Sequence, residues 1–502
     1  MHFSYRGAVG IMYQSNAGQA SVFDDAAHFI GAKLSQNNRW VKMAAMIPWD
    51  VIDEKYSENF KTLNVGQPAK AARMAIGSLL IREKQKISDE ETLEQICENP
   101  YLQWFIGLTE FTDKAPFDKS SMTYFRKRVT PEMLSLVNDY ICGRNQDTGK
   151  KGGDGGGDGA GSEEDTENSG QNKGVLIVDA TCVPSDIKYP TDISLLNGSR
   201  EKLEDMILLL HKQIGADKKA PRVYKKDGRK AYMKFARNKK PKRNEIRTAM
   251  KKQLGYVRRD LKIIASQIEE GGVLTKKQTK TLKTIETIYR QQDEMYREST
   301  RQIENRIVSI SQNWVRPIVR GKTNAAVEFG AKVSISMSDG YSFMEKLSWD
   351  AYNESTTLIA TIENYKEKTG AYPEKILADK IYRTRENLGY CKERGIRMNG
   401  PKLGRPHKDK EICREQRFLE RLEAGERNEV EGKFGEGKRR YYLQRTMTRL
   451  KETTETQIHL TFLVINLSKK LRASLYPIFN WVKITILNTF VQKEKLLMTT
   501  AA

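Results

Sequence analysis

Residues 174–184 of the chain read GVLIVDATCVP. The apolar run Val175–Val178 leads directly into Asp179, and such a run is typical of a strand that is buried on both faces of a sheet. A second apolar run, residues 375–378, ends in the same way at Asp379. Ligand-binding side chains in α/β sheets gather at the carboxyl ends of strands. If these two strands pair, we expect the two aspartates to be neighbours.

A third stretch, RNEVEGKFGEGKRRYYLQR, begins at Arg427. Arg427, Glu431 and Lys438 are spaced at i, i+4 and i+11, which returns to one side of a helix. That side then carries a carboxylate between two cations. A carboxylate can hold a divalent metal ion, and neighbouring cations can bind phosphate.

Each of the three acids also has a purely structural interpretation, and the sequence leaves these open. Asp179 could instead cap a turn, and Asp379 could pair with Lys380 or Arg383. Glu431 could be a surface residue, with Glu429 or Glu436 as the third acid in its place.

Around these stretches the pattern alternates between strands and helices. We expect further strands at residues 330–340, 341–349 and 396–400, and helices at 353–368, 384–394, 410–449 and 453–474. This order is that of a ribonuclease H-like α/β domain with a mixed five-stranded sheet and helices. We assign residues 174–200 and 325–474 to this catalytic domain, and residues 475–502 to a C-terminal tail.

Residues 1–145 are expected to form an α-helical N-terminal domain that binds DNA. Apolar spacing in residues 72–85 is helical, and Ser88 with Glu91 gives a capping-box pattern before the next helix. A short helix then carries three consecutive cations that either contact DNA phosphates or form a solvated basic turn: Arg126, Lys127 and Arg128.

Two segments separate these parts. Residues 146–173 are rich in glycine and acidic residues, with almost no apolar side chain, so we expect a disordered linker between two folded parts. Residues 201–324 are expected to be an insertion. It contains a heptad seam over 246–268 and a similar stripe over 282–310, which predict a helical hairpin that either packs on itself or dimerises.

The insertion contains a strongly basic run. Between Lys218 and Arg243, 13 of 26 residues are Lys or Arg, with aromatic residues among them. Clustered cations with aromatics suit a nucleic-acid backbone, although a solvated arm is the alternative. The cations that we expect to contact DNA are Lys225, Lys226, Arg229 and Lys230.

The composition of the whole chain agrees with a polyanionic partner. Its 502 residues have a formal net charge of +22, and nucleic acid is the usual partner of such a protein. Five cysteines without a CxxC pair favour buried thiols in a reducing cytoplasm. We find neither a secretory signal nor about 18 uninterrupted apolar residues, so we expect no membrane association.

Three converging carboxylates suit phosphodiester chemistry. Two Mg²⁺ ions about 3.5–4 Å apart can activate an oxygen nucleophile and neutralise a leaving oxygen. Mg²⁺ prefers oxygen ligands and keeps several waters, so few carboxylates suffice, and Mn²⁺ is a possible substitute. In this hypothesis Asp179 bridges both ions, and Asp379 and Glu431 each complete one.

Several motifs resemble those of bacterial insertion-sequence transposases of the DDE class, most closely the insertion-sequence 5 superfamily. They are DKIY from Asp379 with GIRMNGPK downstream, the pattern RxxxExxFGxxK from Arg427, GVLIVDATCVPSDIKYPTD around Asp179, and the N-terminal stretches MIPWDVIDEKY and ISDEETLEQICENPYLQWFIGL. The resemblance implies that Asp179, Asp379 and Glu431 are a catalytic triad and that Arg427 and Lys438 contact the transposon-end DNA.

The resemblance has one departure. The related insertion-sequence 4 signature has a Tyr three residues before the Arg, where this chain has Ala424. An aromatic contact to the DNA end is therefore absent or supplied from elsewhere, with Tyr441 and Tyr442 as candidates.

The resemblance implies a Mg²⁺-dependent transposase of the bacterial cytoplasm, associated with the nucleoid. It would bind the double-stranded DNA of the terminal inverted repeats and of the target, as a homodimer or larger synaptic complex. The alternatives are a stand-alone metal-dependent nuclease of the same fold and a non-catalytic basic DNA-binding or scaffold protein.

Overall fold

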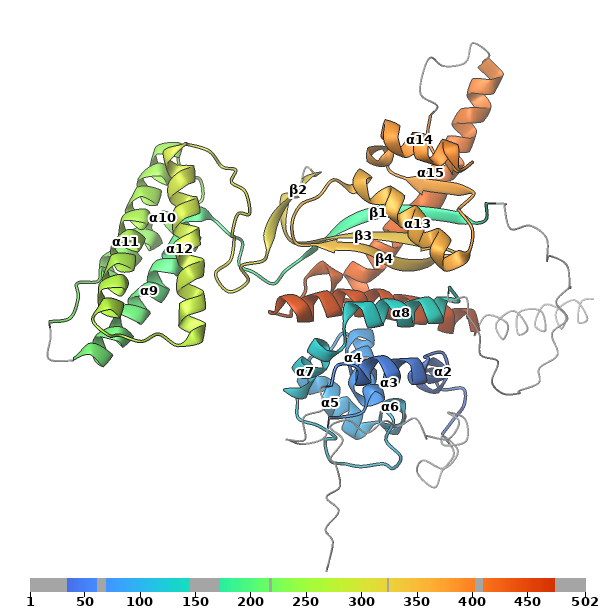
Figure 1. Ribbon diagram of the computed structural model, residues 1–502, viewed down its shortest axis with the longest axis horizontal. Coiled ribbons are helices and arrows are strands. Elements are labelled where there is room, and N and C mark those ends of the chain that lie inside the picture. Colours follow the sequence, from blue (N-terminus) through green and yellow to red (C-terminus); the bar gives the residue numbers. More distant parts are fainter. Residues whose placement is uncertain are drawn as a thin grey trace, which may run out of the picture.

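A computed structural model of the chain describes residues 34–60, 69–144, 172–215, 219–322, 325–401 and 410–474. Figure 1 shows three parts: a central sheet with its helices, a group of N-terminal helices below it, and a separate helical unit to one side. The expected C-terminal tail, residues 475–502, lies outside the described residues.

The central sheet has six strands among the described residues. They are β1 (Val175–Pro184), β2 (Arg316–Lys322), β3 (Ala325–Ser338), β4 (Tyr341–Ser348), β5 (Lys375–Ala378) and β6 (Arg397–Met398). The order is β2-β3-β1-β5-β6, and β4 also pairs with β3. Strand β1 is antiparallel to β3 and parallel to β5, so the sheet is mixed as expected.

The expected number of five strands is wrong, because β2 was assigned to the insertion. This strand contains Pro317, which argues against a central strand but is tolerated at an edge, where no partner requires its missing N–H. Strand β2 is such an edge strand, pairing only with β3. The turn between β3 and β4 is the expected one: Asp339 and Gly340 have φ of 51° and 71°, as the two positions of a tight hairpin turn require.

Alternation along the strands gives the sheet two buried faces. Leu176 and Val178 pack against α13 (Leu358–Thr369) and α14 (Arg385–Glu393). Ile177 belongs to the opposite face, which is covered by α15 (Lys410–Arg440) and by a helix over residues 451–474. Successive side chains of a strand point to opposite faces. Asp179 therefore faces α15, as Ile177 does.

The described N-terminal region consists of helices packed beneath the second face of the sheet (Figure 1). They are α2 (Arg39–Ala45), α3 (Trp49–Ser57), α4 (Ala72–Gln85), α5 (Asp89–Glu98), α6 (Pro100–Phe105), α7 (Ser121–Arg128) and α8 (Pro131–Cys142). Trp40 and Trp104 are buried among them, and Ser88 caps α5 by accepting a hydrogen bond from the N–H of Glu91.

These N-terminal helices and the sheet share one apolar core. Their buried side chains form a single cluster with those of α15 and of residues 451–474. Asn138 on α8 donates to the carbonyl of Ser342 on β4 and accepts from the amide of Asn466. The N-terminal helices and the sheet thus pack directly on one another, and the role of residues 146–173 as a disordered linker between them stays a prediction. The linker itself lies outside the described residues, apart from its last two.

The insertion differs from the expected hairpin. It is a unit of four helices, α9 (Asp192–Ile214), α10 (Lys225–Ala236), α11 (Arg243–Glu269) and α12 (Lys276–Arg297), with a core of its own. Helix α9 packs along α11, and the buried apolar side chains of α9, α11 and α12 form one cluster. The unit thus begins at Asp192 rather than at residue 201. Ile303 and Ile310 lie beyond the end of α12.

Candidate active site

The register between β1 and β5 brings two aspartates together. Val178 pairs with Ala378 in the last parallel pair of these strands, and Asp179 and Asp379 each follow immediately. Strand β1 continues to Pro184 along β3, so Asp179 lies within a strand and not at its end as expected. The neighbouring strand β5 ends at Ala378, so within the described residues Asp179 has no pairing partner on β5.

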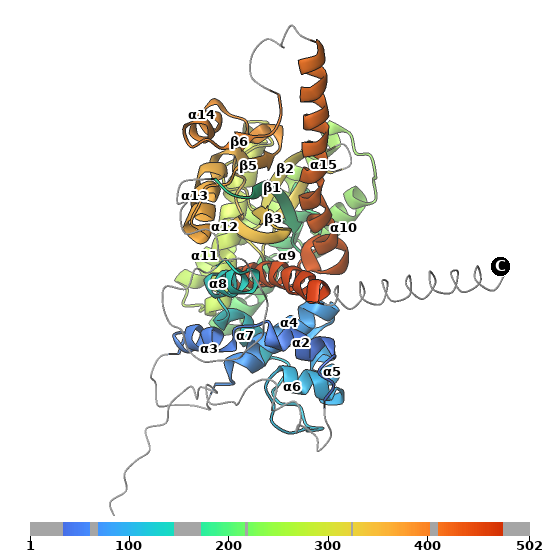
Figure 2. The same ribbon diagram turned by 90° about the vertical axis from the view of Figure 1, so that its right-hand side faces the viewer.

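Helix α15 carries the third acid. The helix is fixed to the sheet by buried Val430 and Phe434, and by an ion pair of Glu426 with Lys375 on β5 at 2.6 Å. Figure 2 shows α15 running along the sheet and extending beyond it. Arg427 and Glu431 follow one another along this helix, and their side chains are 3.2 Å apart between Nη2 and Oε1.

All the predicted catalytic residues line one cleft of about 610 Å³. Asp179 comes from β1, Asp379 follows β5, and Glu431 comes from α15. The two predicted DNA-contacting cations of α15 also line this cleft. Among the lining residues that we did not predict are Lys332, Glu354, Val319 and Ile381. Of the alternatives to Glu431, neither Glu429 nor Glu436 lines the described cleft.

Arg427 lies between two of the acids. Its Nη1 is 3.8 Å from Oδ2 of Asp179, and its Nη2 is 3.2 Å from Oε1 of Glu431. Burial raises the pKa of Asp179 to about 6, against the opposing effects of the Ala180 N–H and Arg427. The charges of Glu354 and Asp379 raise this pKa further. Asp179 thus combines a half-buried position with contact to the cleft, which is typical of functional carboxyl groups.

A second ion pair borders the cleft. Lys332 on β3 lies 2.9 Å from Oε1 of Glu354, the first residue of η1 (Glu354–Thr357), and donates to the carbonyl of Tyr352. Neither residue stands out in the sequence, because Lys332 is one polar position of an alternating strand and Glu354 begins a short turn. Their place at the cleft depends on the pairing of β1 with β3.

The donor set of the cleft fits a hard divalent cation in its chemistry, since all its acidic ligands are oxygen atoms and Asp179 is half-buried. Among the described residues, however, no group of three His, Cys, Asp or Glu side chains is placed closely enough to hold one ion. The guanidinium of Arg427 contacts both Asp179 and Glu431. The three carboxylates that would hold metal therefore line the same cleft, but in this structure they are too far apart to bind one ion together.

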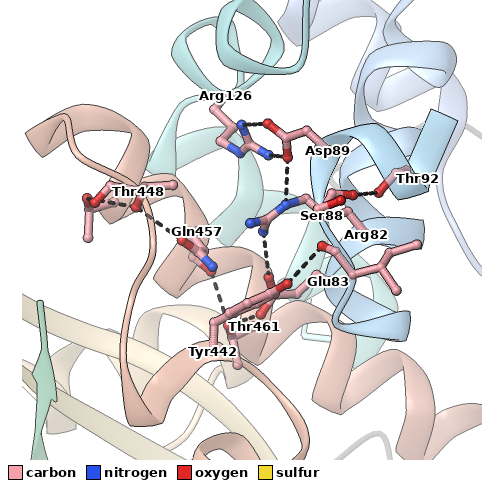
Figure 3. A network of polar contacts seen from close by, with 12 residues as sticks. Arg82, Glu83, Ser88, Asp89, Thr92, Arg126, Tyr442, Thr448, Gln457 and Thr461 are labelled. Carbon is pink, nitrogen blue, oxygen red and sulfur yellow. Dashed lines mark hydrogen bonds and ion pairs between the residues drawn. The ribbon is translucent and has the colours of Figure 1, made fainter. Parts of the chain in front are cut away.

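The prediction that Arg126 contacts DNA is wrong. Its side chain is 4% exposed, and its Nη1 donates to Asp89 at 2.9 Å. Arg82 donates to the same carboxylate at 2.8 Å, so one acid neutralises two buried arginines (Figure 3). Lys127 is exposed, whereas Arg128 packs over the ring of Phe60. Contact of Lys127 and Arg128 with DNA stays a prediction.

Tyr441 and Tyr442 do not offer an aromatic surface to the cleft. Tyr441 is 4% exposed. Tyr442 donates from its hydroxyl to the carbonyl of Ile87, and the guanidinium of Arg82 lies 4.6 Å from its ring centre (Figure 3). Tyr442 therefore joins the end of α15 to the N-terminal helices, whereas the hydroxyl of buried Tyr441 lies 3.3 Å from Oγ of Ser468. Neither ring lines the described cleft.

The basic run of the insertion forms an exposed helix where it is described. Its four predicted DNA-contacting cations are exposed on α10: Lys225, Lys226, Arg229 and Lys230. The helix approaches α9 closely at Gly228, where a Cβ would lie 3.0 Å from the guanidinium of buried Arg200. Lys218, the first cation of the run, lies outside the described residues.

The cleft and sheet define a class of protein. Two aspartates at adjacent strands and a glutamate on a packed helix, on a mixed α/β sheet, are consistent with a ribonuclease H-like fold with an acidic active site. A family model described as a transposase DDE domain matches residues 376–468, and a model described as transposase domain (DUF772) matches residues 28–128. The two matches indicate an insertion-sequence DDE transposase, as the resemblance predicted.

The first match includes Asp379, α15 and most of the helix over 451–474, and a DDE domain implies the ribonuclease H-like fold. Proteins with this domain generally use divalent metal ions. A curated relative, uncharacterized protein ORF8 in the nfe locus of Rhizobium meliloti, is 35% identical over 119 residues. That match covers 24% of this chain and 55% of the relative, so the chain spans about half of that protein's length. No solved structure matches.

Within the described ranges, no helix is both long and apolar enough to cross a membrane.

Proposed function

We propose that this protein is a transposase that binds the terminal inverted repeats of an insertion sequence, cleaves the DNA at the element's ends and joins those ends to target DNA. One observation carries the proposal: Asp179, Asp379 and Glu431, from three separate elements, line one cleft together with Arg427 and Lys438.

The residues of the cleft divide the chemistry between them. Asp179, Asp379 and Glu431 would hold divalent cations, which supply Lewis acidity to activate the attacking oxygen and to neutralise the leaving one. Arg427 and Lys438 would bind phosphate oxygens of the DNA, Arg427 by a bidentate contact if it leaves the acids. Hydrolysis at the end of the element frees a 3′-OH, which then attacks a phosphodiester of the target DNA in the same cleft.

Further DNA contacts would come from the exposed cations of α10 and from Lys127 and Arg128. Both ends of the element must be brought together, so we propose a homodimer or a larger synaptic complex. Light scattering of the protein with a duplex of one end should show a particle that contains at least two chains; a one-to-one complex would contradict this.

The test uses a duplex that carries the inverted repeat bordering the coding sequence, with Mg²⁺ or Mn²⁺. The wild type should nick the repeat and join it to a second duplex. Asp179→Asn, Asp379→Asn and Glu431→Gln should abolish both reactions while DNA binding survives. Glu429→Gln is the matched control on α15, and it should retain activity because Glu429 does not line the cleft.

Three outcomes would change the proposal. Nicking without joining would identify a stand-alone nuclease. Full activity in all three variants would leave only a binding or scaffold role. Loss of activity in Glu429→Gln but not in Glu431→Gln would identify Glu429, and not Glu431, as the third catalytic acid.

A further inference from the structure

Two apolar side chains are exposed at the mouth of the charged cleft. Val319 is 77% exposed, the highest value of any large apolar residue among those described, and Ile381 is 48% exposed. Both line the cleft that also contains the three acids. Single exposed apolar side chains are common on protein surfaces, but these two face the same functional site.

Ile381 is held at the cleft by its neighbours in the chain. It is the middle residue of η2 (Lys380–Tyr382), which follows Asp379 directly. Oδ1 of Asp379 accepts a hydrogen bond from the N–H of Lys380, and the side chain of Tyr382 is fully buried. Asn387 also donates to the carbonyl of Tyr382. With both neighbours anchored, the backbone fixes Ile381 in its exposed position.

Val319 is placed by the alternation of strand β2. Ile318 is 3% exposed, and Val319, the next residue, points to the other side of the strand. Val319 pairs with Val327 on β3, and the ladder becomes irregular directly after it. The exposed side chain therefore lies on a paired strand, at the point where regular pairing ends.

The other residues of the cleft indicate what kind of ligand would cover Ile381 and Val319. Arg427 and Lys438 line the same cleft and suit phosphates, whereas apolar side chains suit the faces of bases. Aliphatic side chains can separate stacked bases and hold them apart. Phe434, the only aromatic residue among those lining the described cleft, is 8% exposed, and Tyr441 and Tyr442 are held elsewhere. Aliphatic residues are therefore the apolar surface available to DNA.

We propose that Ile381 and Val319 contact a base next to the scissile phosphate and hold it out of the stack, so that the strand can enter the cleft. This inference rests on the proposed function, because it requires DNA in the cleft. It assigns to both side chains a role in positioning the strand, with no part in the chemical step.

The experiment follows 2-aminopurine, a base whose fluorescence rises when it is unstacked. The probe is the inverted-repeat duplex with 2-aminopurine placed in turn at each position flanking the cleaved bond, and Ca²⁺ replaces Mg²⁺ to slow cleavage. The variants are Ile381→Ala, Val319→Ala and both together. Val273→Ala is the control, because Val273 is 71% exposed and does not line the cleft.

We expect wild type and Val273→Ala to give a several-fold rise in fluorescence at one flanking position. The double variant should lose most of this rise while anisotropy shows DNA binding within a few-fold of wild type. Each single variant should lose part of it. The side chains of Ile381 and Val319 both lie outside the buried core, so an unchanged melting temperature should verify folding.

Two results would overturn the inference alone: an undiminished rise in the double variant, or a wild type that binds and nicks the duplex with no rise at any scanned position. A wild type that neither binds nor nicks the duplex would overturn the proposed function and this inference with it.

Discussion

Nη1 of Arg427 on α15 lies 3.8 Å from Oδ2 of Asp179 on β1, and the same guanidinium is 3.2 Å from the carboxylate of Glu431. One cation thus lies between two acids that would have to share metal ions. In the absence of metal this arrangement reduces repulsion between the acids. When metal and DNA bind, Arg427 has a phosphate as an alternative partner.

The first prediction concerns competition for these acids. Without DNA, Arg427→Ala should bind Mn²⁺ more tightly than wild type, because the ion no longer displaces a guanidinium from Asp179 and Glu431. Partly exposed ion pairs contribute up to about 1 kcal/mol each, so breaking the two pairs should tighten binding by up to about thirtyfold. Isothermal titration calorimetry measures it. Equal or weaker binding would show that Arg427 does not compete with metal.

The second prediction concerns the packing of α15. A Cβ on Gly437 would lie 2.5 Å from Cδ1 of Leu443, which is fully buried. Gly437→Ala should therefore displace the end of α15 and cost about 1–3 kcal/mol of unfolding free energy. Nicking should fall as well, since Glu431 is on this helix. The measurements are thermal unfolding and the nicking assay.

Gly425→Ala is the matched control on the same helix, since a Cβ there would meet nothing within 4 Å. It should stabilise the protein by up to about 1 kcal/mol, because alanine has the higher helix propensity. If both substitutions had the same effect, close packing at Gly437 would not be what positions α15.

The third prediction concerns the shared partner of two buried arginines. Asp89→Ala should destabilise the protein by about 3 kcal/mol or more, because buried Arg126 would lose its counter-ion and Arg82 would keep only the 3.7 Å contact with Glu83. Glu90→Ala, which breaks only the exposed pair with Lys119, should cost less than about 1 kcal/mol. Chemical denaturation would compare the two. Equal costs would mean that water readily replaces Asp89.

The fourth prediction is a pH dependence in the insertion. Burial, then the charge of Glu204, raises the pKa of Asp260 from 3.8 to about 7, against the effects of Arg200 and Arg259. The folded state therefore prefers the neutral acid, and its stability falls as the pH rises from about 4 through 7. Asp260→Asn should be more stable than wild type at pH 8, by up to about 4 kcal/mol from the size of the shift.

Differential scanning fluorimetry between pH 4 and pH 8 tests this. The difference in melting temperature between Asp260→Asn and wild type should vanish near pH 4 and be largest at pH 8. A constant difference across this range would mean that Asp260 does not titrate as its burial suggests.

The fifth prediction concerns the exposed cations of α10. Replacing Lys225, Lys226, Arg229 and Lys230 by Gln should weaken DNA binding and reduce the slope of log K against log salt, by about 0.9 for each phosphate that the helix no longer neutralises. Fluorescence anisotropy at several salt concentrations measures the slope. An unchanged slope would exclude this helix from the DNA interface.

Local sequence was sufficient to predict several parts of the site. The apolar runs before Asp179 and Asp379, and the helical spacing of Arg427, Glu431 and Lys438, each depend on a few adjacent residues. The Asp339-Gly340 turn is equally local. The structure places these residues on the elements where the patterns predicted them, although β1 extends beyond Asp179.

The parts that sequence reasoning missed depend on distant partners. Arg126 has the sequence of a basic turn, but it is buried and pairs with Asp89 on another helix. Lys332 and Glu354 reach the cleft through strand pairing. Helix α9 joins the insertion because its apolar face meets α11, and a heptad pattern in one helix does not identify which helix will cover it.

The common core of the N-terminal helices and the sheet limits how such a protein can be recombined. Arg144, the last described residue before the linker, donates to Ser338 and stacks over Phe343, so the two halves meet through matched side chains. Exchanging the first 144 residues for those of a relative would replace Asn138, the hydrogen-bond partner of Ser342 and Asn466. We therefore expect the N-terminal helices and the sheet to be inherited together, because each part completes the packing of the other.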